Sequence, residues 1–269
     1  MKKRVISAAV LVIAVVLLYL IKNPIPFITC ASLVGILGLK EILDLKESHK
    51  ELPTYVKVIA YICLLLTMIG RVKVDYLLLG LPFLAICLTC LSLVIPTIFE
   101  FDGRYTTKDA FYLIGSVTFL GTFFNLLILL FSYNRWLLLF LIIIATMTDT
   151  FAMLIGSLIG KHKLIPKVSP NKSIEGSLFG TIIATAIAVI YYNNVITTDT
   201  NIVLLIVMVI ALSVLGQLGD LLFSKIKREN GIKDFSQIMP GHGGILDRVD
   251  SLTFITIGYV LIINIISLF

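Results

Sequence analysis

The chain has 269 residues, of which 58% are hydrophobic and only 14% are charged. Soluble globular domains are about half apolar and about a quarter charged. This composition therefore excludes an ordinary soluble domain and indicates helices that cross a membrane. The net charge of +6 does not indicate a nucleic-acid partner, because polytopic membrane proteins carry an excess of Lys and Arg in their cytoplasmic loops.

Apolar segments follow one another along the whole chain. They lie at about 5–21, 25–39, 54–70, 76–98, 110–132, 136–160, 174–192, 202–223 and 252–268. Most of them approach the roughly 20 apolar residues that a helix needs to span the hydrocarbon core. The sequence therefore predicts an all-α polytopic membrane protein with about nine transmembrane helices.

The basic residues predict how these helices are oriented. Most of the 22 Lys and Arg residues fall in one set of alternate connections, beginning with Lys2, Lys3 and Arg4 at the N-terminus. Connections rich in Lys and Arg stay in the cytoplasm during insertion. We therefore expect a multi-pass protein of the cell's inner (cytoplasmic) membrane, with its N-terminus in the cytoplasm and its C-terminus outside.

Residues 40–52 form a charged amphipathic stretch that continues the second apolar segment. Such a stretch is typical of a helix end that lies in solvent or at the membrane interface. His49 within it has no companions at metal-ligand spacing. We therefore assign no role to His49.

Asp149 lies well inside the sixth apolar segment, between Thr148 and Thr150. A carboxylate at membrane depth costs about 2.5 kcal/mol or more unless it faces a polar cavity, a cation or a partner. Two interpretations stay open, a structural salt bridge inside the bundle and a functional carboxylate. Gly156 and Gly160 follow as a G-x-x-x-G pair, which is typical of close helix packing.

The polar segment 161–176 holds four Lys residues and two Pro residues. The Lys residues suit the positive-inside bias of a cytoplasmic loop. The run that ends in Ser173 and Glu175 equally resembles a shaped turn into a helix start, where amide groups and cations both favour phosphate. Taken alone, this segment indicates either a topology signal or an anion site.

The segment 224–251 is the most densely charged part of the chain, with five Lys or Arg, four Asp or Glu, one His and four Gly residues. Asp220 precedes it, and Asp247 and Asp250 are spaced to share one face of a helix. Its Gly residues either form a tight re-entrant turn or let backbone amides approach a bound anion.

Four carboxylates thus lie on or near the cytoplasmic halves of three predicted helices: Asp149, Asp220, Asp247 and Asp250. Carboxylates without thiols or clustered imidazoles suit Mg²⁺, which prefers oxygen ligands. The attack of one phosphate on another needs phosphates held by metal ions, positive charge around them and a backbone that can come close to them. The carboxylates, the Lys and Arg residues and the Gly residues of these segments suit that reaction. A site at the membrane surface suits one lipid substrate and one soluble substrate.

The segment 224–250 closely resembles the signature of the phosphatidate cytidylyltransferases, also called CDP-diacylglycerol synthases. The matching positions are Ser224, Lys227, Arg228, Lys233, Asp234, Pro240, His242, Gly243, Gly244, Asp247, Arg248 and Asp250. The upstream sequence D-T-F-A followed by G-K-H-K-L-I-P-K-V-S-P-N-K-S-I-E-G resembles the second block of that family. Ser173 stands where Thr is commoner, and Phe235-Ser236 replaces the more usual Ser-Gly.

The resemblance implies transfer of the CMP moiety of CTP to phosphatidic acid, giving CDP-diacylglycerol and pyrophosphate. It implies Mg²⁺, with a second metal or a monovalent cation such as K⁺ beside it. The implied metal ligands are Asp149, Asp220, Asp247 and Asp250. The implied catalytic residues are Asp220, Asp247, Lys227, Arg228, Lys233 and His242. The implied substrate-binding residues are Lys167, Ser169, Lys172, Ser173, Glu175, Ser224, Asp234, Gly243, Gly244 and Arg248.

We therefore expect a single membrane domain over 1–269, in which 1–135 is mainly a scaffold and 136–269 holds the catalytic helices and cytoplasmic loops. The expected partners are CTP, phosphatidic acid, membrane lipids and a second copy of the chain in a homodimer. Two alternatives stay open. One is a cation or phosphate transporter with membrane-embedded carboxylates, and the other is a related CTP-dependent transferase that acts on an isoprenoid lipid phosphate.

Overall fold

The computed structural model describes residues 19, 21, 23–69, 81–100, 103–197, 201–239 and 243–267. The first predicted apolar segment lies almost wholly outside these ranges, as do Pro240 and His242. The chain divides into two compact units, Met1–Ser132 with Phe235–Ile245 and Tyr133–Asp234 with Leu246–Phe269. The division falls close to position 135, where the sequence analysis separates scaffold from catalytic helices. The expected single domain stays a prediction.

The first unit contains α2 (Ile25–Glu47), α3 (Thr54–Ile69), α4 (Leu81–Val94), α5 (Pro96–Phe99) and the first half of α6 (Thr107–Ile159). Helix α3 packs between α2 and α4. Fully buried apolar side chains such as Leu39, Leu64 and Phe123 form its core. Pro96 separates α4 from α5, because proline has no N–H to continue the helical hydrogen bonds.

Helix α6 corresponds to two predicted segments, 110–132 and 136–160. Its 53 residues are interrupted by Asn134, whose backbone is extended with φ −155° and ψ 103°. The Asn134 side-chain oxygen accepts a hydrogen bond from the Trp136 amide at 2.9 Å, as a helix N-cap does. The residue therefore ends one helical stretch and begins the next.

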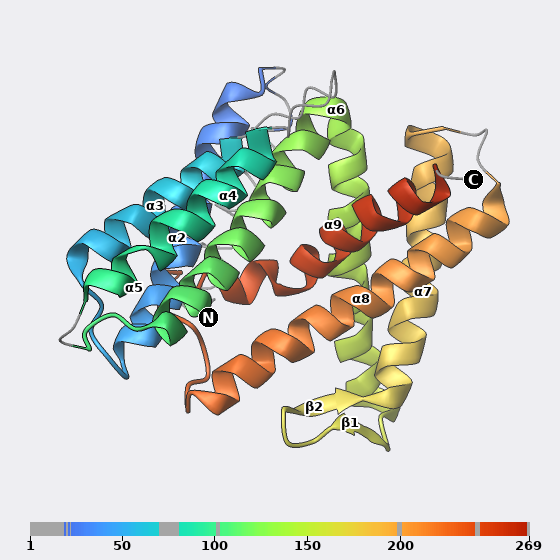
Figure 1. Ribbon diagram of the computed structural model, residues 1–269. Coiled ribbons are helices and arrows are strands. Elements are labelled where there is room, and N and C mark those ends of the chain that lie inside the picture. The colour runs from blue at the N-terminus through green and yellow to red at the C-terminus, as the bar shows by residue number, and fades with distance from the viewer. Residues whose placement is uncertain are drawn as a thin grey trace. The chain divides into compact units, whose positions relative to one another are not determined.

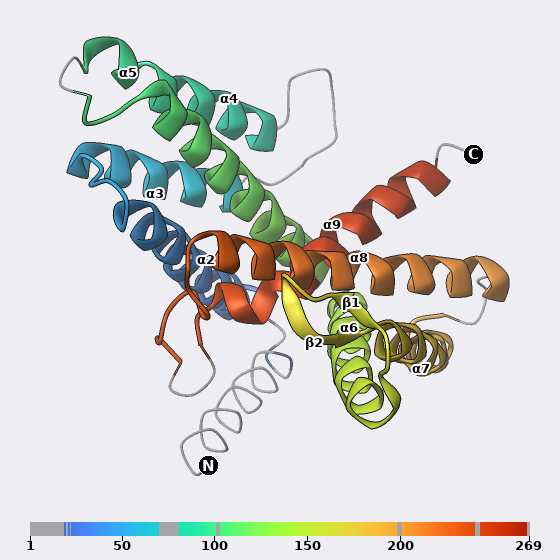
Figure 2. The ribbon, with the colours of Figure 1, turned by 90° about the horizontal axis from the view of Figure 1, so that it is seen from below.

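The second unit contains the rest of α6, the strands β1 (Lys163–Ile165) and β2 (Ser169–Ser173), and the helices α7 (Ile174–Val195), α8 (Ile202–Glu229) and α9 (Leu246–Ile266). Helix α8 packs against both α7 and α9 (Figures 1 and 2). The two strands form a short antiparallel hairpin where the sequence analysis expects only a turn. Its polar residues show no strand pattern, so hydropathy does not predict it.

Two helices in this unit are longer than their apolar segments. Helix α8 continues to Glu229, past the predicted end at 223, and α9 begins at Leu246 rather than at 252. Charged residues end an apolar segment, but they do not interrupt helical hydrogen bonding. Asp220, Lys227, Asp247 and Asp250 therefore all lie on helices, which fixes their spacing.

Close packing of α6 against α7 depends on small residues. A Cβ on Gly156 would lie 2.8 Å from the Ser173 Oγ, and one on Gly180 would lie 2.8 Å from the Ala152 backbone nitrogen. A Cβ on Gly176 would lie 2.9 Å from the Gly156 Cα. The expected role of the G-x-x-x-G pair in helix packing is consistent with these distances.

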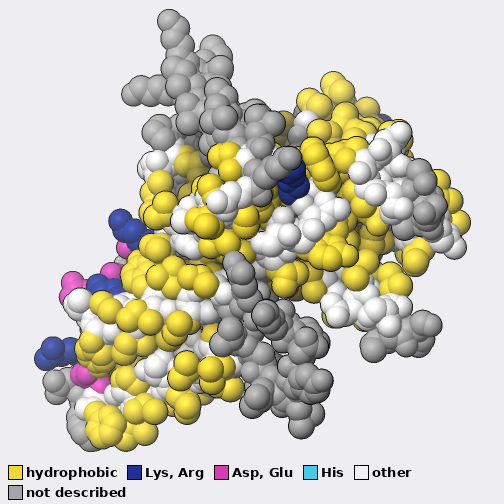
Figure 3. Space-filling model, turned by 90° about the horizontal axis from the view of Figure 1, so that it is seen from above, with side chains coloured by type: hydrophobic (Ala, Val, Ile, Leu, Met, Phe, Trp, Pro, Cys, Tyr) yellow, Lys and Arg dark blue, Asp and Glu magenta, His cyan; other side chains and the backbone are white. Residues whose placement is uncertain are grey.

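Five helices of the described chain are long and apolar enough to cross a membrane: α2, α6, α7, α8 and α9. Two further apolar helices, Thr54–Ile69 and Leu84–Phe99, are shorter. Apolar side chains cover much of the described surface seen in Figure 3, with few charged side chains among them. The chain is thus a multi-pass, predominantly α-helical membrane protein.

The polar end of α2 differs from the expectation of a solvated or interfacial helix end. Glu41 is only 1% exposed. Lys46 and Lys50 both form ion pairs with Asp109, at 2.8 and 2.5 Å. Part of this charged stretch therefore packs into the first unit. Partners that are distant in the sequence compensate for the burial of its charged side chains.

Candidate active site

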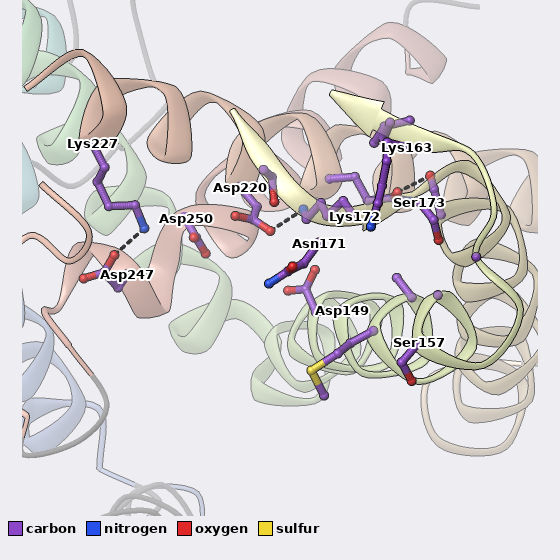
Figure 4. A pocket seen from close by; sticks show the side chains of 18 of the residues that line it. Asp149, Ser157, Lys163, Asn171, Lys172, Ser173, Asp220, Lys227, Asp247 and Asp250 are labelled. Carbon is purple, nitrogen blue, oxygen red and sulfur yellow. Dashed lines mark hydrogen bonds and ion pairs between the residues drawn. The ribbon is translucent and has the colours of Figure 1, made fainter. Parts of the chain in front are cut away.

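A cavity of about 780 Å³ lies within the second unit, bounded by residues of α6, β2, α7, α8 and α9 (Figure 4). Its acidic lining residues are Asp149, Asp220, Asp234, Asp247 and Asp250. Its basic lining residues are Lys163, Lys172, Lys227 and Arg248. The four carboxylates that the sequence analysis selects thus share one polar cavity, although they come from three helices.

Asp149 faces this cavity from α6. Its Oδ2 accepts a hydrogen bond of 2.9 Å from the Ser251 hydroxyl, which also lies 3.4 Å from the Asp250 Oδ1. The charge of Asp220 repels the charges of Asp149 and Asp250. Within the described part of the chain Asp149 forms no ion pair, so the alternative of a structural salt bridge is not what the structure shows.

Two lysines neutralise the other two carboxylates. Lys172 on β2 pairs with Asp220 on α8, and the Lys227 Nζ lies 2.5 Å from the Asp247 Oδ1. Lys227 is only 9% exposed, and burial of an unpaired ammonium would be costly. Both pairs are drawn in Figure 4. The cavity therefore combines carboxylates that are paired with lysines and carboxylates that are not.

Helix geometry accounts for how the charged side chains converge. Asp247 lies in the first turn of α9, where the helix dipole favours an acidic residue. Asp250, three residues later, lines the same cavity, as the shared helix face predicts. On α8 the Ser224 hydroxyl donates to the Asp220 Oδ1 one turn earlier, at 3.3 Å.

The hairpin brings polar side chains to the cavity and leads into α7. Ser169, Lys172 and Ser173 line the cavity. The Ser173 hydroxyl also caps α7, because it accepts a hydrogen bond of 3.1 Å from the Gly176 amide. Glu175 is not among the lining residues. It accepts hydrogen bonds from the amides of Lys161 and His162 and so fixes the start of the hairpin.

Several other selected residues that the structure describes do not line this cavity. Lys167 lies in the exposed turn of the hairpin, and Lys233 is exposed beyond the end of α8. Arg228 donates from Nη1 to the Ile232 carbonyl at 3.1 Å. Gly243 and Gly244 are buried in the first unit, and His242 lies outside the described residues. The roles assigned to all of these residues stay predictions.

Comparison with known proteins identifies the family. The chain matches the model of the cytidylyltransferase family over residues 2–266. The chain belongs to this family. It is 34% identical over 260 residues to a phosphatidate cytidylyltransferase of Staphylococcus epidermidis, covering 95% of this chain and 96% of the relative. Phosphatidate cytidylyltransferases of Staphylococcus saprophyticus and Staphylococcus aureus are 33% and 32% identical over 262 residues, with the same coverage.

This chain is therefore an enzyme, a membrane nucleotidyltransferase, and the resemblance drawn from its motifs is confirmed. The family match covers the N-terminal helices as well as the motif-bearing half. Hydropathy predicts those helices, but hydropathy alone could not assign them to this family.

The sequence analysis does not select several polar residues at or beside the cytidylyltransferase cavity. Ser177 donates to the Oε1 of Gln217, and the Gln217 Nε2 donates to the Thr181 Oγ1 at 2.8 Å. Ser213 also donates to the Thr181 Oγ1, at 3.0 Å. These side chains tie α7 to α8 beside the cavity, which Ser177 and Gln217 line. Their signal in the sequence is a pair of polar residues spaced four apart on each of two apolar helices.

The donor set of this cavity suits a hard divalent cation. No three His, Cys, Asp or Glu side chains of the described ranges are close enough together to hold one metal ion. Mg²⁺, however, commonly binds one or two carboxylates and takes waters and substrate phosphates as its other ligands. The oxygen atoms of Asp149, Asp220, Asp247 and Asp250 provide donors of that kind. The residues present therefore fit Mg²⁺ in their chemistry.

Proposed function

We propose that this enzyme transfers the CMP moiety of CTP to phosphatidic acid, giving CDP-diacylglycerol and pyrophosphate for phospholipid synthesis. The observation that carries the proposal is the cavity itself. In it, the helix residues Asp149, Asp220, Asp247 and Asp250 lie together with several Lys and Arg side chains. The Staphylococcus relatives are named phosphatidate cytidylyltransferases, which supports the same substrate pair.

The basic lining residues account for substrate binding. CTP and phosphatidic acid both carry negative phosphates, and Lys163, Lys172, Lys227 and Arg248 supply positive charge on the cavity wall. Lys172 forms an ion pair with Asp220, and Lys227 forms one with Asp247. We infer that both ammonium groups turn toward phosphate oxygens in the substrate complex. Such positive charge stabilises the transferring phosphoryl group.

The proposed reaction is an attack by the lipid phosphate oxygen on the α-phosphorus of CTP. A bond forms between these two atoms, the bond from the α-phosphorus to the bridging oxygen breaks, and pyrophosphate leaves with the electron pair. A phosphomonoester carries about −1.5 to −2 charges at neutral pH, so it needs no dedicated base. Mg²⁺ held by the cavity carboxylates would neutralise phosphate charge during this displacement.

We further propose that the cavity opens to the cytoplasmic side of the inner membrane, where CTP is available. The distribution of Lys and Arg supports an N-terminus inside and a C-terminus outside, and the apolar segments support about nine spans. Substituted-cysteine labelling of Lys167 and Lys233 from either side of sealed vesicles tests the orientation. Labelling of both positions from the periplasmic or external side would contradict it.

Pyrophosphate release by the purified protein in detergent tests the activity. CTP, phosphatidic acid and Mg²⁺ are omitted in turn, and we expect release only with all three present. Other nucleotides and an isoprenoid phosphate replace the substrates in separate reactions. Asp220→Asn should lower the rate more than about 100-fold, whereas Glu229→Gln, an exposed carboxylate on the same helix, serves as the matched control.

Three results would contradict the proposal. One is release that does not require phosphatidic acid, and a second is a preference for an isoprenoid phosphate. The third is ion or phosphate flux in liposomes without consumption of CTP, which would favour a transporter. The same detergent preparation tests the expected homodimer by light scattering corrected for bound detergent.

A further inference from the structure

A buried carboxylate of α2 accepts hydrogen bonds from the connection between α8 and α9. Glu41 on α2 is 1% exposed. Its Oε1 accepts a hydrogen bond of 2.6 Å from the Ser236 hydroxyl and another of 2.7 Å from the Ile245 amide. Ser236 and Ile245 lie near the two ends of the segment Phe235–Ile245, which belongs to the same compact unit as Glu41. One oxygen atom therefore holds both ends of this segment.

Gly244 lies against the same carboxylate. A Cβ built on Gly244 would meet the Oε1 of Glu41 most closely and would lie 2.7 Å from its Cδ and Oε2. The carboxylate would therefore have to shift, and it would lose its hydrogen bonds to Ser236 and Ile245. The backbone of Gly244 does not have a positive φ, whereas Gly243 has φ 81°. Gly243 is thus required by its backbone conformation, and Gly244 by the space that Glu41 occupies.

These contacts matter for the site because of where the segment leads. Ile245 directly precedes α9 and is two residues from Asp247 in the chain. A carboxylate is costly to bury unless hydrogen-bond donors surround it, so Glu41 and its donors stabilise one arrangement of the segment ends. Loss of the carboxylate would release the backbone immediately before the helix turn that carries Asp247 and Asp250.

We propose that Glu41 is a positioning residue for nucleotidyl transfer, which holds Ser236 and Ile245 and, through Ile245, the start of α9. Gly244 accommodates Glu41 in this arrangement and does not serve to bring a backbone amide to the substrate. The inference rests on the proposed function, because it assigns α9 and its carboxylates to the transfer site. It also gives a role in the reaction to α2, which the sequence analysis treats as scaffold.

A double-substitution experiment separates these two roles of Gly244. Gly244→Ala should lower kcat about tenfold or more in the wild-type background, because the methyl group meets Glu41. In a Glu41→Ala background, which is itself slower, the same substitution should cost less than about twofold because the space is free. Gly243→Ala is the matched control, and its cost should be equal in both backgrounds since it arises from φ.

Conservative variants separate the hydrogen bonds from the volume of Glu41. Glu41→Gln keeps an acceptor oxygen and the same bulk, so it should retain more activity than Glu41→Ala and should leave the cost of Gly244→Ala unchanged. Glu47→Ala removes another carboxylate of α2, which pairs with Lys57, and should stay within about twofold of wild type. If Glu41→Ala does not fold, Glu41→Asp withdraws the carboxylate by one methylene and replaces it in the cycle.

Hydrogen–deuterium exchange gives a readout that does not depend on the reaction. The peptide that contains the Ile245 amide should exchange at least tenfold faster in Glu41→Ala than in the wild type, without nucleotide or lipid. Equal exchange in the two proteins, or an equal cost of Gly244→Ala in both backgrounds, would overturn the proposal. If the exchange changes but the purified wild type transfers no CMP, the anchor stands and the proposed function fails.

Discussion

Asp109 and the carboxylates of the cavity show two different ways to place acidic side chains in this protein. Asp109, in the first turn of α6, accepts from Lys46, Lys50, the Thr106 hydroxyl and the Thr106 amide. It is 2% exposed and does not line the cavity. In the cavity, Asp149 and Asp250 share one hydroxyl group, that of Ser251.

The difference lies in the balance of charge around each carboxylate. Asp109 has two ammonium groups and two further donors, so its charge is fully compensated inside the protein and the cluster is structural. The cavity holds more carboxylates than ammonium partners can neutralise directly, and it has room for further ligands. An acidic group that is under-compensated at membrane depth is expected to meet a cation or a substrate. This contrast predicts that replacing Asp by Asn lowers activity in the cavity but lowers stability at Asp109.

Asp247→Asn should have the largest effect on activity. Asn keeps the shape of the side chain and an acceptor for Lys227, but it removes the negative charge from the cavity. We expect the rate of CMP transfer to fall more than about 100-fold while the protein still inserts and purifies normally. Incorporation of labelled cytidine nucleotide into lipid measures the effect, and an active Asp247→Asn protein would remove this residue from the reaction.

Asp109→Asn should act on stability instead. Removing one partner of a fully buried ion pair costs about 3–5 kcal/mol, and the partly exposed lysines reduce this to about 2 kcal/mol. We expect a thermal midpoint lower by several degrees and an activity per folded molecule within about twofold of wild type. Thermal unfolding in detergent checks the first result. A large loss of activity without a change in stability would show that the comparison is wrong.

Ser251→Ala should have a smaller effect than either charge substitution. It removes the hydroxyl that donates to Asp149 at 2.9 Å, and a hydrogen bond to a charged group contributes about 1.5–3 kcal/mol. We expect a fall in kcat of about tenfold. Ser267→Ala, just beyond the end of α9, is the control, and Ser251→Thr should restore part of the rate. An unchanged rate in Ser251→Ala would mean that Asp149 is positioned by other contacts.

The sequence predicts those parts of this molecule that depend on local composition. Apolar segments predict the long helices, and the three-residue spacing of Asp247 and Asp250 predicts their shared face. Contacts between distant segments leave no such signal. Nothing in the sequence around Glu41 indicates that it meets Ile245, and the β1–β2 hairpin has no alternating pattern. Ser251 is an ordinary helix residue until the fold brings Asp149 beside it.

The glycine seam between α6 and α7 has a practical consequence for protein engineering. A library intended to change which nucleotide or lipid the enzyme accepts should leave Gly176 and Gly180 untouched, because a single added carbon there would meet the backbone of α6 and force the two helices apart. Diversity belongs instead at Met153, Ser157 and Asn171, which line the cavity without filling that seam. The tolerance of this enzyme to redesign is thus set by where two backbones touch.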